Sequence, residues 1–132
     1  MASESKHISI SIDRPLSVVY DYISNPANLP EWAAGLGTSV EQIDREWVAD
    51  SPIGRVVVAF TPRNDLGVVD HDVTLPSGET VHNPMRVIAD GSAAEVVFTL
   101  RRQPGVSGAD FATDAAAVFA DLAVLKSTLE SR

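Results

Sequence analysis

The sequence contains no cysteine, few aromatic residues (6% Phe, Trp and Tyr) and no long apolar run. Without cysteine, the chain can form no disulfide, no catalytic thiol and no zinc–thiolate site. No segment approaches the roughly 20 consecutive apolar residues that a membrane-spanning helix needs. The N-terminal residues MASESKHISI also lack the apolar stretch of a signal peptide. We therefore expect a cytoplasmic protein that does not insert into membranes.

Positive charge is also scarce. Ten Lys and Arg residues stand against 18 Asp and Glu residues, which gives a net charge of −8. Nucleic-acid binding needs a surplus of cations on one face, so we expect no nucleic-acid partner. The 132 residues and the 45% hydrophobic content fit one globular domain over residues 1–132. A core of that size needs no structural metal or disulfide. We predict no cofactor and either a monomer or a homodimer.

The first third of the chain predicts one strand and two short helices. Residues 7–12 alternate between polar residues and isoleucine, as a half-buried strand does. Apolar residues then recur at helical spacing from Leu16 to Ile23, with Asp13 as the candidate N-cap and Asn25–Pro26 as the stop. A second short helix is expected over residues 27–35.

The rest of the chain predicts an antiparallel meander followed by a long helix. Period-two patterns separated by turn residues indicate six strands, at 38–43, 46–50, 54–62, 67–75, 79–89 and 93–102. A helix of about six turns then begins after Ser107, whose spacing to Asp110 resembles a capping box. Its apolar stripe consists of Phe111, Ala115, Val118, Leu122, Leu125 and Leu129. Asp114 and Asp121 are expected elsewhere on the helix surface.

This order is an α+β arrangement, and with the segment IDRPLSVVYDYISNPANLPEW it resembles the SRPBCC superfamily. The superfamily includes START-like lipid carriers, plant pathogenesis-related ligand binders and polyketide cyclase/dehydrase proteins. The most specific match is the pattern at residues 13–32. The resemblance implies a helix-grip fold, in which a curved seven-stranded antiparallel sheet wraps around the C-terminal helix and leaves an elongated cavity. It implies no single function, because its members differ in activity.

The run VVDHDVTL raises the question of what His71 does between two aspartates. Side chains alternate along a strand, so His71 shares a face with Val69 and Val73, whereas Asp70 and Asp72 point the other way. The histidine face is the more apolar and should look inward. The two carboxylates cannot then chelate a metal together with the imidazole, and we predict no metal site. Burial should lower the pKa of His71 below about 6.5.

The hairpins test this assignment, because partners across a ladder lie on the same face. The predicted pairs are Leu75–Glu79, Val73–Val81, His71–Asn83, Val69–Met85, Val87–Val96, Met85–Phe98 and Asn83–Leu100. They agree on one concave apolar surface with His71 and Asn83 in its middle and Arg102 near one end. Pro84 lies inside a predicted strand, and a bulge there would reverse the faces on one side of it.

Three functions fit these residues. The first is binding of a small hydrophobic or aromatic ligand between the sheet and the last helix. The second is a polyketide cyclase/dehydrase-like enzyme in which His71 transfers a proton and Asn83 or Arg102 stabilises an enolate oxygen. The third is an interaction or accessory domain with a filled core, where His71 is only a hydrogen-bonded interior residue. A cavity of about 300 Å³ or more would favour the first two. The candidate ligand-binding residues are Trp32, Val58, Phe60, Val69, His71, Asn83, Met85, Phe98, Leu100, Arg102, Val118 and Leu122.

Overall fold

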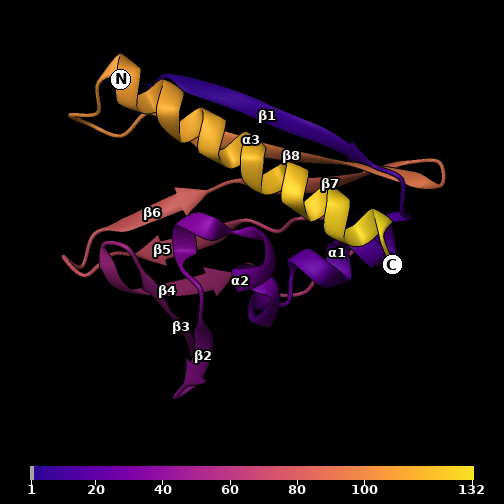
Figure 1. Cartoon of the computed structure of the whole chain (residues 1–132), viewed down its shortest axis with the longest axis horizontal. Helices are drawn as coiled ribbons and strands as arrows, with labels where there is room; N and C mark the ends of the chain where they lie inside the picture. Colours follow the sequence, from indigo (N-terminus) through magenta and orange to yellow (C-terminus); the bar gives the residue numbers. More distant parts are fainter. Residues whose placement is uncertain (1) are drawn as a thin grey trace.

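The structure, a computed structural model, describes residues 2–132 and consists of curved antiparallel sheets covered by one long helix (Figure 1). The strands are β1 (Ser5–Ile12), β2 (Val40–Ile43), β3 (Glu46–Ser51), β4 (Gly54–Phe60), β5 (His71–Thr74), β6 (Thr80–Asn83), β7 (Met85–Asp90) and β8 (Ala93–Arg101). The helices are α1 (Leu16–Ile23), α2 (Leu29–Trp32) and α3 (Gly108–Glu130), with 3-10 turns at Pro26–Asn28 and Ala34–Leu36. None of the helices is long and apolar enough to cross a membrane.

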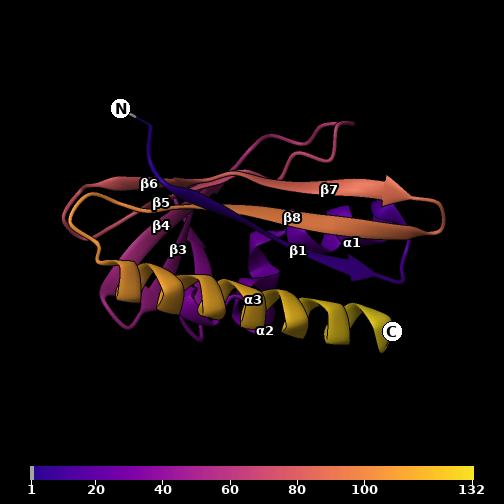
Figure 2. The same cartoon turned by 90° about the horizontal axis from the view of Figure 1, so that it is seen from above.

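Eight strands replace the seven that the sequence predicts, because Pro84 interrupts the strand expected over residues 79–89. Proline has no N–H for the ladder, so β6 ends before it and β7 begins after it. β6 closes a five-stranded sheet of order β2-β3-β4-β5-β6, and β7 lies at the edge of a three-stranded sheet of order β1-β8-β7. Figure 2 shows β6 and β7 following each other along one side of the molecule.

Pro84 does not reverse the faces of the sheet. The register pairs His71 with Asn83 on one side of the proline and Met85 with Phe98 on the other. Val69 donates its N–H to the Met85 carbonyl at 3.0 Å, which continues the same register past the break. The predicted strand pairing is therefore confirmed except for Asn83–Leu100, because β8 pairs with β7 only from Met85 onward and Asn83 belongs to the other sheet. One concave face runs through both sheets.

The helix α3 crosses this concave face (Figures 1 and 2). Ser107 caps it by accepting a hydrogen bond from the Asp110 N–H at 3.0 Å, as its spacing predicts. Its burial is uneven along its length. Leu122, Leu125 and Leu129 are at most 1% exposed, whereas Ala115 and Val118 in the preceding turns are only half-buried.

Some details of the predicted elements differ. Asp13 does not cap α1: Pro15 is the N-cap residue and no side chain caps the helix. The Asp13 N–H is instead bound by Glu130 Oε2 at 2.8 Å, which ties the start of α1 to the end of α3. The strand expected over residues 67–75 is regular only from His71, because Asn64 bonds its side chain to Val68 and holds residues 64–68 in a loop.

Candidate functional site

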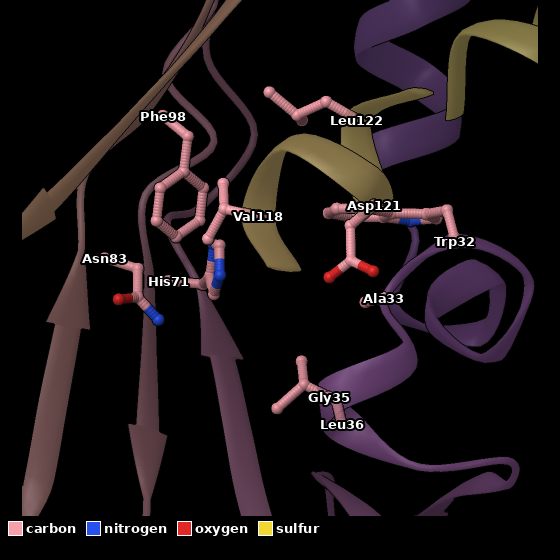
Figure 3. Close-up of a pocket in the computed structure, with 10 residues that line it drawn as sticks. All are labelled: Trp32, Ala33, Gly35, Leu36, His71, Asn83, Phe98, Val118, Asp121 and Leu122. Carbon is pink, nitrogen blue, oxygen red and sulfur yellow. The ribbon is translucent and has the colours of Figure 1, made fainter. Parts of the chain in front are cut away.

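A pocket of about 210 Å³ lies between α2, α3 and the concave face of the strands. We call it the central pocket. Figure 3 shows its residues arranged around one space, with β5, β6 and β8 on one side and α2 and α3 on the other. Its lining residues are Trp32, Ala33, Gly35, Leu36, His71, Asn83, Phe98, Val118, Asp121 and Leu122. Most of this surface is apolar, and three side chains bring polar atoms to it: His71, Asn83 and Asp121.

His71 begins β5 and is 4% exposed. Its ring lies between two aromatic rings, with centroid distances of 4.9 Å to Phe60 and 6.0 Å to Phe98. Nδ1 is 3.2 Å from the Val69 carbonyl oxygen. Because a carbonyl can only accept, Nδ1 carries the proton in the neutral ring, and Nε2 is left as an acceptor. Burial lowers the pKa of His71, which confirms the predicted direction and favours this neutral form.

Asn83 ends β6 directly opposite His71. Figure 3 shows its amide beside the imidazole, on the sheet side of the pocket. An amide offers both a donor and an acceptor, so it can complement either kind of ligand group. The pocket therefore has an acceptor at His71 and an adaptable group next to it.

Trp32 closes the opposite side of the pocket from α2. It is 5% exposed, and its indole N–H has no hydrogen-bond partner among the described residues. A buried donor without a partner is uncommon and costs about 1–3 kcal/mol. Trp32 lines the pocket with its ring, while the indole nitrogen itself exposes almost no surface.

The rim of the pocket is the segment 33–37 between α2 and β2. Gly37 fixes its path: its φ is +98°, and a Cβ there would come within 1.7 Å of the Asp50 carbonyl oxygen. No side chain fits this close approach, so only glycine is compatible with it. Ala33, Gly35 and Leu36 thereby reach the pocket; none of them is among the candidate ligand-binding residues, but the two glycines of AAGLGTS do indicate a turn at the cavity rim.

Asp121 is a pocket residue that contradicts the sequence prediction. The helical stripe placed it elsewhere on the surface, but it lines the pocket next to Leu122 and one turn after Val118. One carboxylate oxygen, Oδ1, accepts the Ala34 N–H at 3.3 Å. Burial raises the pKa of Asp121 above its ordinary value, and the bond from Ala34 opposes that only in part. Asp121 follows Val118 by three residues, which makes the two neighbours on the helix surface, and this spacing could have identified Asp121 as a pocket residue.

Several predicted site residues lie outside the central pocket. Val58, Val69 and Met85 are at most 1% exposed and belong to the packed layer behind it. Phe60 contacts the His71 ring without lining the pocket. Leu100 lines an adjoining hollow of about 410 Å³, which shares Gly35, Asn83, Phe98, Val118 and Asp121 with the pocket.

Arg102 also lies elsewhere, because its guanidinium is engaged near the N-terminus of the described chain. Nε donates to the Val106 carbonyl at 2.7 Å, and Nη1 lies 3.1 Å from a Glu4 carboxylate oxygen. These bonds hold the loop before α3, and they leave the lining of the central pocket without arginine.

The two aspartates beside His71 face away from the pocket. Asp72 bonds His82 at 2.6 Å across the ladder, and Asp70 accepts the Met85 N–H at 2.7 Å and pairs with Arg86. This is the outer face of the sheet, as the alternation predicts. Among residues 2–132, no three His, Asp or Glu side chains are grouped so that they could hold a metal ion.

Comparison with known proteins places the fold. No family model matches the sequence, and no curated protein matches it. Solved structures do match over nearly the whole chain. A START superfamily protein from Mycobacterium smegmatis has a TM-score of 0.68 at 13% identity, with 96% of this chain and 97% of that chain covered. The chain has a helix-grip fold of the SRPBCC type.

Two further helix-grip structures are named for biosynthetic proteins. Truncated norcoclaurine synthase from Thalictrum flavum matches with a TM-score of 0.60 at 12% identity, over 98% of this chain and 94% of that one. The di-domain ARO/CYC protein BexL of the BE-7585A pathway matches with a TM-score of 0.68 at 17% identity, over 96% of this chain and 46% of that one. At such identities, the likeness establishes the fold alone.

Proposed function

We propose that this protein binds a small aromatic or apolar molecule in the central pocket. The observation that carries the proposal is a largely apolar pocket into which His71, Asn83 and Asp121 bring polar atoms. An apolar wall with a few convergent polar groups is the usual composition of a ligand site. A filled interior, the alternative accessory role, would leave no such space.

The volume limits the size of the ligand. At about 210 Å³, the pocket falls below the volume of about 300 Å³ that would by itself favour a ligand or enzyme site over a filled core, and below that of sites for drug-sized molecules. A dry cavity of about 150 Å³ is enough for benzene. We therefore propose a ligand with one ring and a short substituent, or two fused rings, and not a long acyl chain. The adjoining hollow gives such a ligand a route toward solvent.

The polar groups favour a ligand with a hydroxyl or a similar group. His71 Nε2 can accept a hydrogen bond, and the Asn83 amide can accept or donate one. A hydroxyl satisfies either, while its ring packs on Phe98 and Leu122. The names of the similar structures agree with a small-molecule role, since one is a synthase and another belongs to a biosynthetic pathway.

Calorimetric titration with 2-phenylethanol tests the proposal. Val118→Phe should fill the pocket and weaken binding at least about tenfold. The matched control is Val124→Phe, the same substitution at a residue of α3 that is 46% exposed and outside the pocket lining, and it should bind like the parent protein. Circular dichroism would verify that both variants fold. Equal binding by Val118→Phe, or no binding by the parent protein at millimolar probe, would contradict the proposal.

A second candidate function, proton transfer, is favoured by the ionisable pair in the pocket. Burial lowers the pKa of His71 and raises that of Asp121, and opposite shifts of this kind suit an acid–base pair. His71 Nε2 would take the α-proton of a ketone to give an enolate and an imidazolium, with the Asn83 amide donating to the enolate oxygen.

Deuterium incorporation into phenylacetone in D₂O would detect this reaction. The expected outcome is incorporation above the buffer rate that is lost in His71→Gln, a variant that keeps a polar side chain at this position. Incorporation that persists in the variant would eliminate His71 as the base.

A further inference from the structure

The carboxylate of Asp121 restricts the kind of ligand more than the volume of the pocket does. It projects from α3 into the space between His71 and the rim segment (Figure 3). Its one hydrogen bond among the described residues is the contact of Oδ1 with the Ala34 N–H, at 3.3 Å. Oδ2 has no described protein donor. A carboxylate in an apolar pocket is costly unless something compensates its charge.

No cation of the described chain provides that compensation. The lining of the central pocket and of the hollows beside it contains no lysine or arginine. The nearby hollow of about 410 Å³ adds a second carboxylate, Asp114, one heptad before Asp121 on α3. The shift of the Asp121 pKa agrees with this, because its causes include burial and one backbone bond but no neighbouring positive charge. Among the described residues, the only charged side chains that line the pocket and this hollow are thus two carboxylates.

Two aromatic side chains line the pocket together with this carboxylate. Trp32 and Phe98 line the pocket with Asp121, on opposite sides of it (Figure 3). Ring faces attract cations as well as other rings, and tryptophan does so most strongly. A carboxylate flanked by aromatic side chains is therefore complementary to a positively charged group attached to a ring.

We propose, building on the proposed function, that the central pocket selects aromatic amines in their protonated form, with the ammonium group against Asp121. The ammonium supplies the counter-charge that the chain does not, and the aromatic ring occupies the apolar wall of Phe98, Val118 and Leu122. Carboxylates of the same size are rejected, because they would face Asp121 and Asp114 without a cation. Neutral alcohols bind between these extremes.

Three probes of nearly equal size test the selection by calorimetry: 2-phenylethylamine, 2-phenylethanol and phenylacetate. The expected order of affinity is amine, alcohol, then carboxylate, with the amine about 5- to 20-fold tighter than the alcohol, as for a charge-assisted hydrogen bond. In Asp121→Asn, the ratio of amine to alcohol affinity should fall to about one. The asparagine oxygen can still accept the Ala34 N–H, so the rim keeps its bond.

Asp90→Asn is the matched control. It removes the same charge from an exposed site at the far end of β7, where no described side chain bonds to Asp90. The amine-to-alcohol ratio should stay at the parent value in this variant. An equal fall in both variants would mean that the preference reflects net charge and not the pocket, and it would overturn the proposal.

The outcomes separate this inference from the proposed function. If the parent protein binds the alcohol as tightly as the amine, the proposed selection of amines is wrong, while the proposed binding of a small molecule is still supported. If none of the probes binds, both are wrong. Should Asp121→Asn fail to fold, carboxyl NMR of the parent protein decides: the amine should lower the pKa of Asp121 and the alcohol should not. An unchanged pKa with the amine bound would contradict contact with Asp121.

Discussion

Two stretches of α3 cover the same concave face with different results. Around Leu125 and Leu129 the interior is filled, and the helix end is fixed by Asp13 and by Arg14, whose guanidinium donates to the Leu129 carbonyl at 2.8 Å. Around Val118 and Asp121, two turns earlier, the helix borders the central pocket. The first stretch stabilises the fold, and the second leaves room for a ligand. One helix thus serves both purposes by changing the size and polarity of its inward residues.

The largest effect should come from the filled stretch. Leu125→Ala removes a side chain with no exposed surface and should lower the free energy of unfolding by about 2–5 kcal/mol. Val118→Ala truncates a half-buried side chain that already faces open space, so its cost should be about 1 kcal/mol or less. Urea unfolding measures both. Equal losses in the free energy of unfolding would contradict the distinction between a filled stretch and a stretch that borders the pocket.

The rim of the pocket should depend on one glycine and not on its neighbour. Gly37→Ala forces a Cβ into the Asp50 carbonyl at a positive φ and should cost about 2 kcal/mol or more. At Gly35 a Cβ meets nothing within 4 Å, so Gly35→Ala should change stability by less than about 0.5 kcal/mol. Thermal unfolding of the two variants would reveal whether the rim is held as we describe.

Stability should depend on pH through His71. Its pKa is lowered in the folded state, so between the folded and unfolded values the unfolded chain binds more protons. The contribution of His71 is therefore complete above about pH 6.5 and is lost as the pH falls below it, by at most about 1.4 kcal/mol per pH unit. The free energy of unfolding, measured from pH 7.5 to 5.5, should decline in this way below about pH 6.5, and His71→Asn should reduce the decline. The same slope in the variant would assign it to other groups.

The smallest effect concerns Asp121. A raised pKa in the folded state means that folding favours its protonated form, so its ionised form weakens the fold at neutral pH and does so less as the pH falls. Asp121→Asn should raise the free energy of unfolding at pH 7 by less than about 1 kcal/mol, because water screens this half-exposed group. Destabilisation would indicate that the carboxylate serves the fold.

The sequence predicts most of the sheet because its information is local. Alternation put His71 inward and Asp72 outward, and the short turn at 76–78 fixed Asn83 opposite His71. Those assignments depend on neighbours within one hairpin. Pro84 was expected only as a possible bulge inside one strand, and the division into β6 and β7 depends on how two sheets separate, which no single hairpin specifies.

The opposite wall of the pocket was harder to predict. Asp121 lies at the flank of the apolar stripe, and a flank position faces solvent or a cavity depending on what stands across from it. The rim residues around Gly35 come from irregular backbone, where no periodicity indicates direction. Arg102 fitted the strand pattern, but its long side chain reached Glu4 and Val106 instead of the pocket.

The NMR signal of the Trp32 indole should report whether a ligand enters the central pocket. The chain has two tryptophans, and Trp47, on β3, does not line the pocket. On titration with 2-phenylethanol, the ¹⁵N-correlated indole signal of Trp32 should move progressively while that of Trp47 stays fixed, because a ligand in the pocket reaches only the first. In Val118→Phe, the movement should be lost. Fixed signals from both tryptophans at probe concentrations that bind by calorimetry would place the ligand elsewhere and contradict the account.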